Sequence, residues 1–314
     1  MIVPAGKAPR RILDPKRRLK MSNTKCPYCF QDFSASAAKN EDHVIGRKFV
    51  PSGALAASWN LVVNAHVKCN SDKGRLESQI SSITLHQLHF GGNRLFALGE
   101  KRFEISLEIR RKGRVRSPVT RRFVAESANE HTMEHRMGPI FFKLGMVSPP
   151  QLDPDGVLKL AAMHIRGLCT LVFGGEQGDN LQYLPSNFML VAEAGRGDWG
   201  NARTRAFMDV VRSWPSRLNL SGAARGFFQA MIRKEPSAFP VWAWALEWNR
   251  QHRTMGFMGD DLEHLKMLES SLPKPAWSIE RAIFDPQHGA GYERYRTETP
   301  LRPEEDILFH GDYL

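Results

Sequence analysis

The chain has 314 residues, of which 42% are hydrophobic and 25% are charged. This composition is typical of a globular protein with one large or two ordinary domains, and it excludes a chain that is disordered throughout. The longest apolar runs, such as 168–173, are much shorter than the roughly 20 residues that a membrane-spanning helix needs, so we expect no membrane partner. The formal net charge of +11 favours a polyanionic partner, and nucleic acid is the natural candidate.

Cysteine usage indicates a reducing compartment. The chain has four cysteines, three of which gather in the first quarter of the sequence, while Cys169 lies in an apolar stretch and is expected in the core. A disulfide framework would need dense, paired cysteines in a short secreted chain. The N-terminus also lacks the apolar stretch of a secretory signal. We therefore expect a cytoplasmic protein.

Residues 1–22 are expected to form a flexible basic arm. The first twenty residues carry seven lysines and arginines against one acid, Asp14, and prolines and a glycine interrupt any helical period. Such an arm either follows a phosphate backbone or is a solvated tail, and the sequence leaves both alternatives open.

Two pairs of soft ligands flank the segment that follows. Cys26 and Cys29 are spaced as in a tight metal-binding turn, and His66 and Cys69 repeat that spacing. Together they form a Cys3His set suited to structural Zn²⁺. The 36 residues between the two pairs exceed the intervals of common zinc fingers, so the zinc would clamp the ends of an inserted structure. After the second pair, Leu76 and apolar residues four and seven positions later predict a helix that begins near Asn70.

The inserted segment carries polar residues suited to hydrolysis. Asp42 is an oxygen ligand for a hard divalent ion such as Mg²⁺ or Mn²⁺, and His43 is a general base that would take a proton from the water attacking phosphorus. Asn70 would supply a second ligand, and Asn60 would fix backbone or ring orientation. Because neighbouring side chains on a strand point to opposite faces, we expect a distortion at 42–43 that lets both face the substrate.

These residues, in this order, resemble the HNH endonucleases. The resemblance covers about 23–85 and implies a ββα-metal unit in which Asp42 and Asn70 hold the ion, His43 is the base and Asn60 is the middle asparagine. Asparagine at the last ligand position is a departure from the histidine of the family name and implies weaker binding of the ion. Three cations are expected to contact nucleic acid: Arg47, Lys48 and Lys73.

Beyond this unit the pattern predicts a mixed α+β region. Residues 91–136 are expected to hold a β-hairpin with a very basic turn, made of strands near 102–109 and 115–123. The region 137–314 is expected to form an α+β domain of unknown role, in specificity, regulation or interaction. The predicted elements are helices at 157–172, 202–214 and 221–233 and extended segments at 183–192 and 241–248. The tryptophans of the last segment are interpreted as core residues.

The sequence therefore predicts an α+β protein in which an HNH nuclease domain, 23–90, is followed by a larger domain. The predicted function is metal-dependent hydrolysis of phosphodiester bonds in DNA, with RNA as an alternative substrate, by a defence, restriction-type or mobile-element nuclease. The alternative is a zinc-dependent nucleic-acid-binding module whose nuclease site is vestigial.

Overall fold

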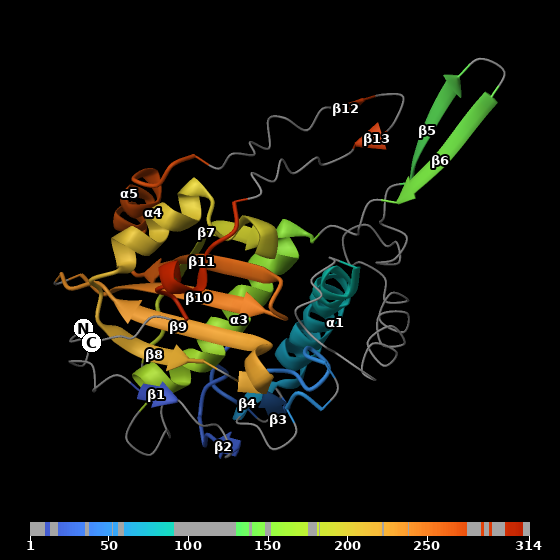
Figure 1. Ribbon diagram of the computed structural model, residues 1–314. Helices are drawn as coiled ribbons and strands as arrows, with labels where there is room; N and C mark the ends of the chain where they lie inside the picture. Colours follow the sequence, from blue (N-terminus) through green and yellow to red (C-terminus); the bar gives the residue numbers. More distant parts are fainter. Residues whose placement is uncertain are drawn as a thin grey trace.

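The computed structural model describes most of the chain and shows a mixed α+β fold (Figure 1). The residues described are 10–12, 18–34, 38–51, 53–55, 60–90, 130–137, 140–147, 152–174, 181, 183–221, 223–237, 239–274, 284–285, 289–290 and 299–309.

The N-terminal unit is a small sheet covered by one helix. Its strands have the order β2–β4–β3, with β3 antiparallel and β2 parallel to β4. The helix α1 follows β4 without a break. The elements are β2 (Arg18–Lys20), β3 (Lys39–His43), β4 (Asn60–His66) and α1 (Val67–Phe90). Within 23–90, β3, β4 and α1 follow one another in the strand–strand–helix order that the family resemblance implies.

The predicted inner face of α1 is confirmed. Ile80 and Ile83 are 2% and 1% exposed, and Leu76 is partly buried against the same core. The helix begins three residues earlier than expected, at Val67. The spacing of apolar residues at i, i+4 and i+7 identified this face because it follows the helical period.

A six-stranded sheet forms the centre of the C-terminal part (Figure 1). Its order is β1–β8–β9–β10–β11–β7; β1 runs parallel to β8 and the other neighbours are antiparallel. The strands are β1 (Arg10–Ile12), β7 (Asn187–Gly195), β8 (Ser216–Leu220), β9 (Phe228–Lys234), β10 (Val241–Trp248) and β11 (His252–Gly259).

The central strands β9, β10 and β11 are buried on both faces of the sheet, as the side chains of β10 illustrate. Trp242, Trp244 and Trp248 point to one face and are at most 2% exposed, which confirms them as core residues. Val241 and Ala243 point to the other face. The first face packs against α3 (Pro154–Phe173) and the N-terminal unit, and the second against α4 (Ala202–Val211) and α5 (Leu262–Ser270).

The helix α3 joins the two parts of the molecule. Asp153 caps its N-terminus by accepting a hydrogen bond from the backbone of Gly156 at 3.0 Å. A Cβ atom on Gly167 would lie 2.9 Å from both methyl groups of Val44, so this glycine lets the N-terminal unit approach closely. By length and composition α3 is apolar enough to cross a membrane, and in this fold most of it is buried. Cys169 on this helix is fully buried, as expected.

One hydrophobic core contains residues of both parts. Ile45 and Phe49 of the N-terminal unit belong to the same cluster of buried residues as Leu168 of α3 and Trp248 of β10. The side chain of Asn249 strengthens this contact by donating to the Phe49 carbonyl at 3.1 Å. The N-terminal unit is therefore packed against the C-terminal part over a buried surface.

Several smaller elements complete the described residues. They are β5 (Glu130–Met137), β6 (Ile140–Val147), β12 (Phe284–Asp285), β13 (Gly289–Ala290) and the 3-10 turns η2 (Arg196–Asp198), η3 (Ala223–Gly226) and η5 (Pro303–Glu305). The antiparallel β5–β6 hairpin crosses the boundary expected between 136 and 137. The predicted hairpin strands at 102–109 and 115–123 lie outside the described residues.

Other expected elements differ from the structure. The helix at 157–172 and the strand at 241–248 are confirmed as α3 and β10. The helix at 202–214 is confirmed as α4 but ends at Val211, and the strand predicted at 183–192 is β7, Asn187–Gly195. The predicted helix at 221–233 is wrong: Ala224 and Arg225 have φ values of 49° and 56°, and β9 follows. The segment expected as a flexible basic arm contributes β1 and β2 to the two sheets, because its backbone pairs with β8 and β4.

Candidate metal centre and active site

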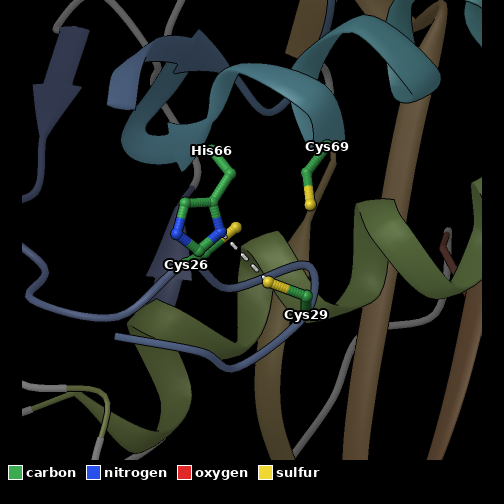
Figure 2. A group of neighbouring side chains, drawn as sticks. All are labelled: Cys26, Cys29, His66 and Cys69. Carbon is green, nitrogen blue, oxygen red and sulfur yellow. Dashed lines mark hydrogen bonds between the residues drawn. The ribbon is translucent and has the colours of Figure 1, made fainter. Parts of the chain in front are cut away.

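The four predicted soft ligands come together in the structure (Figure 2). Cys26 and Cys29 lie in one tight turn, His66 is the last residue of β4 and Cys69 is in the first turn of α1. Their ligand atoms all lie within 4.8 Å of one another. Nδ1 of His66 faces the cluster, at 3.3 Å from Sγ of Cys29. This Cys3His cluster could hold a metal ion such as zinc.

The electrostatics of the cluster fit a cation. Burial raises the pKa of the Cys26 thiol. Burial and the neighbouring sulfurs of Cys26 and Cys29 raise the pKa of Cys69 to about 12. These raised pKa values disfavour three thiolates side by side in the absence of a cation, and a divalent ion coordinated by the sulfurs would stabilise the thiolate forms. The fold supports the turn from outside, since Nη1 of Arg166 on α3 donates to the Tyr28 carbonyl at 3.0 Å.

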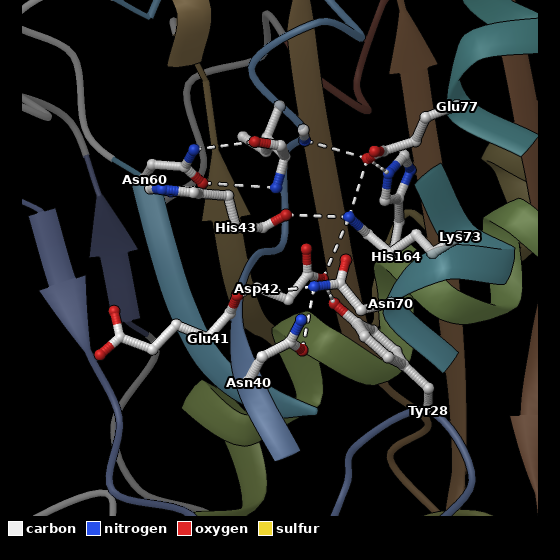
Figure 3. Close-up of polar contacts among 12 residues, drawn as sticks. Tyr28, Asn40, Glu41, Asp42, His43, Asn60, Asn70, Lys73, Glu77 and His164 are labelled. Atoms are coloured by element: carbon white, nitrogen blue, oxygen red, sulfur yellow. Dashed lines mark hydrogen bonds and ion pairs between the residues drawn. The ribbon is translucent and has the colours of Figure 1, made fainter. Parts of the chain in front are cut away.

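Asp42 and His43 occupy the end of β3 and point to opposite faces of the strand (Figure 3). The pairing of β3 with β4 is continuous from Lys39–His66 to His43–Val62, with no bulge. The expected distortion at 42–43 is therefore wrong, because the regular ladder keeps the ordinary alternation of side chains. Asp42 is 7% exposed and faces α1, whereas His43 is half-buried and lies beside Asn60.

Asn60 holds the backbone that follows the candidate base. Its Nδ2 donates to the Ile45 carbonyl at 2.8 Å, and its Oδ1 accepts from the Ile45 amide at 3.3 Å. The side chain is 6% exposed, so these two bonds are made away from water. Asn60 therefore fixes the turn two residues after His43, which is the backbone-fixing geometry expected for it.

Replacing Asn60 by alanine should destabilise the fold. The change leaves both backbone groups of Ile45 without their buried partner, at a cost of about 1–3 kcal/mol for each unsatisfied group. Urea unfolding followed by circular dichroism measures the loss. The matched control is Asn64→Ala on the same strand, whose side chain donates one longer bond, to Asn23 at 3.4 Å. Equal stability of the two variants would contradict this role.

Asn70 lies against the residues that precede Asp42. Its Nδ2 donates to Oδ1 of Asn40 at 3.1 Å and to the Glu41 carbonyl at 3.5 Å. Asn40 and Asp42 share a face of β3, and Asn70 of α1 lies against this part of the strand with its Nδ2 toward it (Figure 3). The carboxylate of Asp42 and the amide oxygen of Asn70 are the kinds of oxygen donor that fit Mg²⁺ or Mn²⁺.

The carboxylate of Asp42 already has protein partners. It accepts a hydrogen bond from the Tyr28 hydroxyl, and its Oδ2 is 3.2 Å from Nζ of Lys73. Burial raises the pKa of Asp42, and the Lys73 ammonium opposes this effect. A divalent ion bound at Asp42 would therefore share the carboxylate with Lys73.

The structure corrects the role expected for Lys73. Its side chain is 0% exposed and its ammonium points inward, so it cannot contact a phosphate. Sequence alone suggested an exposed cation because lysine is seldom buried without paired charges. The other two cations expected to contact nucleic acid, Arg47 and Lys48, are exposed in the turn after β3.

Three residues of this site were not expected from the sequence. Tyr28 lies between the cysteines of the first pair, and Glu77 and His164 complete the surroundings of Lys73. Glu77 follows Lys73 by four residues on α1, a spacing that places both on one helix face and could have indicated the pair. His164 gave no such signal, because it approaches from a helix 87 residues further along the chain.

Comparisons with protein-family models, with curated proteins and with solved structures found no match to this chain.

Proposed function

We propose that this chain is a zinc-containing, metal-dependent HNH endonuclease that hydrolyses phosphodiester bonds in DNA. The observation that supports the proposal most is the β3–β4–α1 unit. The end of β3 carries Asp42 and His43, β4 begins with Asn60, and the start of α1 brings Asn70 against β3. The net charge of +11 suits a polyanionic substrate.

In this proposal the residues have separate roles. His43 accepts a proton from the attacking water, since imidazole ordinarily titrates near neutral pH. Asp42 and Asn70 hold Mg²⁺ or Mn²⁺, which when bound neutralises charge on the phosphate oxygens. Because the base and the ion ligand lie on opposite faces of β3, the phosphate must bind at the end of the strand, where it can reach both. Arg47 and Lys48 follow directly and would contact the nucleic-acid backbone.

A second candidate function rests on a specific observation. Tyr28 and Lys73 both engage the Asp42 carboxylate, as they would in a site that no longer binds an ion. The chain would then be a zinc-dependent nucleic-acid-binding module with a vestigial nuclease site.

A plasmid assay separates the two candidates. Supercoiled DNA is incubated with the zinc-loaded protein and Mg²⁺, Mn²⁺ or neither ion, and a filter-binding titration over a salt series runs in parallel. The endonuclease is expected to give nicked or linear product only with the added ion. Binding that weakens steeply with salt, without product under either ion, would select the binding module.

A further inference from the structure

The Lys73 ammonium is enclosed by three oxygen acceptors (Figure 3). Its Nζ is 2.9 Å from Oε1 of Glu77, 3.2 Å from Oδ2 of Asp42 and 2.8 Å from the His43 carbonyl oxygen. A fully buried ammonium needs such partners, because an unpaired charge away from water strongly destabilises the fold. Lys73 therefore connects the proposed ion ligand to the backbone of the proposed base.

Glu77 is held in place from two directions. Its Oε1 accepts from the Gly46 amide at 2.9 Å and lies 3.0 Å from Nε2 of His164. Burial alone would raise the pKa of Glu77, but Lys73 and His164 outweigh it and lower the pKa to about 2. The carboxylate is thus ionised at neutral pH and remains beside Lys73.

His164 reaches Glu77 from α3, in the C-terminal part of the chain. It is fully buried, and its ring makes edge contacts with Phe49, Phe228 and Trp248 at centroid distances of 5.1, 5.2 and 5.7 Å. Burial lowers its pKa despite the nearby Glu77. The neutral ring donates Nε2–H to Glu77, since an ionised carboxylate only accepts.

The charges suggest why two carboxylates surround one ammonium. When Asp42 binds a divalent ion, the repulsion between that ion and Lys73 rises. The negative charge of Glu77 then still compensates the positive charge of Lys73. Without Glu77, Asp42 would be the one remaining carboxylate partner of Lys73 among the described residues, and the ammonium would compete with the ion for it.

We propose that Glu77 is a positioning residue, which retains the Lys73 ammonium while Asp42 binds the catalytic ion, and that His164 of α3 keeps Glu77 in position. This inference rests on the proposed function. It gives α3 a part in building the nuclease site.

Binding of Mn²⁺ alone, followed by the electron paramagnetic resonance signal of the free ion, tests the inference in the full-length, zinc-loaded protein. Glu77→Gln is expected to weaken Mn²⁺ binding about 10–100-fold, the usual effect of removing a group that orients a metal ligand. His164→Gln is expected to weaken it in the same direction. Glu263→Gln, which removes a carboxylate with 81% side-chain exposure on α5, should leave binding unchanged.

A double variant separates positioning from a general structural role. Glu77→Gln combined with Lys73→Met removes the stranded ammonium, so Mn²⁺ affinity should recover relative to Glu77→Gln. A residue that only supported the fold would give no such rescue. Zinc content and circular dichroism are measured on every variant to show that it is folded. If Glu77→Gln does not fold, the Mn²⁺ affinity of His164→Gln is compared with that of wild type instead.

The outcomes distinguish this inference from the proposed function. If wild type binds Mn²⁺ no better than Asp42→Asn, the proposed function fails and the inference fails with it. If Asp42→Asn loses binding but folded Glu77→Gln and His164→Gln bind Mn²⁺ like wild type, the inference alone is overturned. Absence of recovery in the double variant also overturns it.

Discussion

Replacing Cys26 by serine is expected to remove bound zinc and to unfold the N-terminal unit. Cys26 is 0% exposed, and its sulfur lies within 4.8 Å of the other three ligand atoms. Structural zinc contributes about 10–16 kcal/mol of apparent binding free energy in small zinc units, which is comparable to the whole stability of a typical domain. Cys26 and Trp248 belong to one hydrophobic core. We therefore expect unfolding of the N-terminal unit also to destabilise the six-stranded sheet.

The fourth cysteine provides the matched control. Cys169→Ser makes the same chemical change at a fully buried site on α3 that is not part of the Cys3His cluster. It should keep one zinc per chain and show only the smaller cost of burying a hydroxyl group, about 1–3 kcal/mol. Elemental analysis of the purified variants and their urea unfolding curves give both quantities. Zinc retention and unchanged stability in Cys26→Ser would contradict the clamp.

The features that could be predicted from the sequence are those encoded by local spacing. Two short pairs of ligands predicted the Cys3His cluster, and apolar residues at the helical period predicted the inner face of α1. Alternating bulky residues predicted β10. The helix and strand patterns each lie within a few residues of the chain, and the ligand pairs are recognised by residue types that bind the same kind of metal ion. These patterns can therefore be interpreted without knowing how the rest of the chain folds.

The features that could not be predicted depend on distant partners. The contact of His164 with Glu77 joins residues 87 apart, and the burial of Lys73 follows from that packing. The segment expected as a helix at 221–233 is a 3-10 turn followed by β9, because β9 pairs with β8 and β10 and this tertiary pairing outweighs a weak helix propensity. The regular end of β3 likewise reflects its pairing with β4.

The second large effect is expected at His43. Replacement by alanine removes the general base, and a positioned general base contributes typically about 10²–10⁴-fold to the rate. His43 is half-buried at the end of β3, and Asn60 fixes the adjacent turn through the backbone of Ile45. The alanine variant should therefore keep its zinc, its fold and its affinity for DNA while it loses cleavage.

The most direct test is the single-turnover rate of plasmid cleavage by wild type and His43→Ala under Mg²⁺. Both proteins are brought to one zinc per chain, and DNA binding is measured on the same samples. We expect wild type to cleave, and His43→Ala to bind equally well and cleave at least about 100-fold more slowly. Identical cleavage by the two proteins, or no cleavage by wild type under Mg²⁺ or Mn²⁺, would contradict a nuclease with His43 as its base.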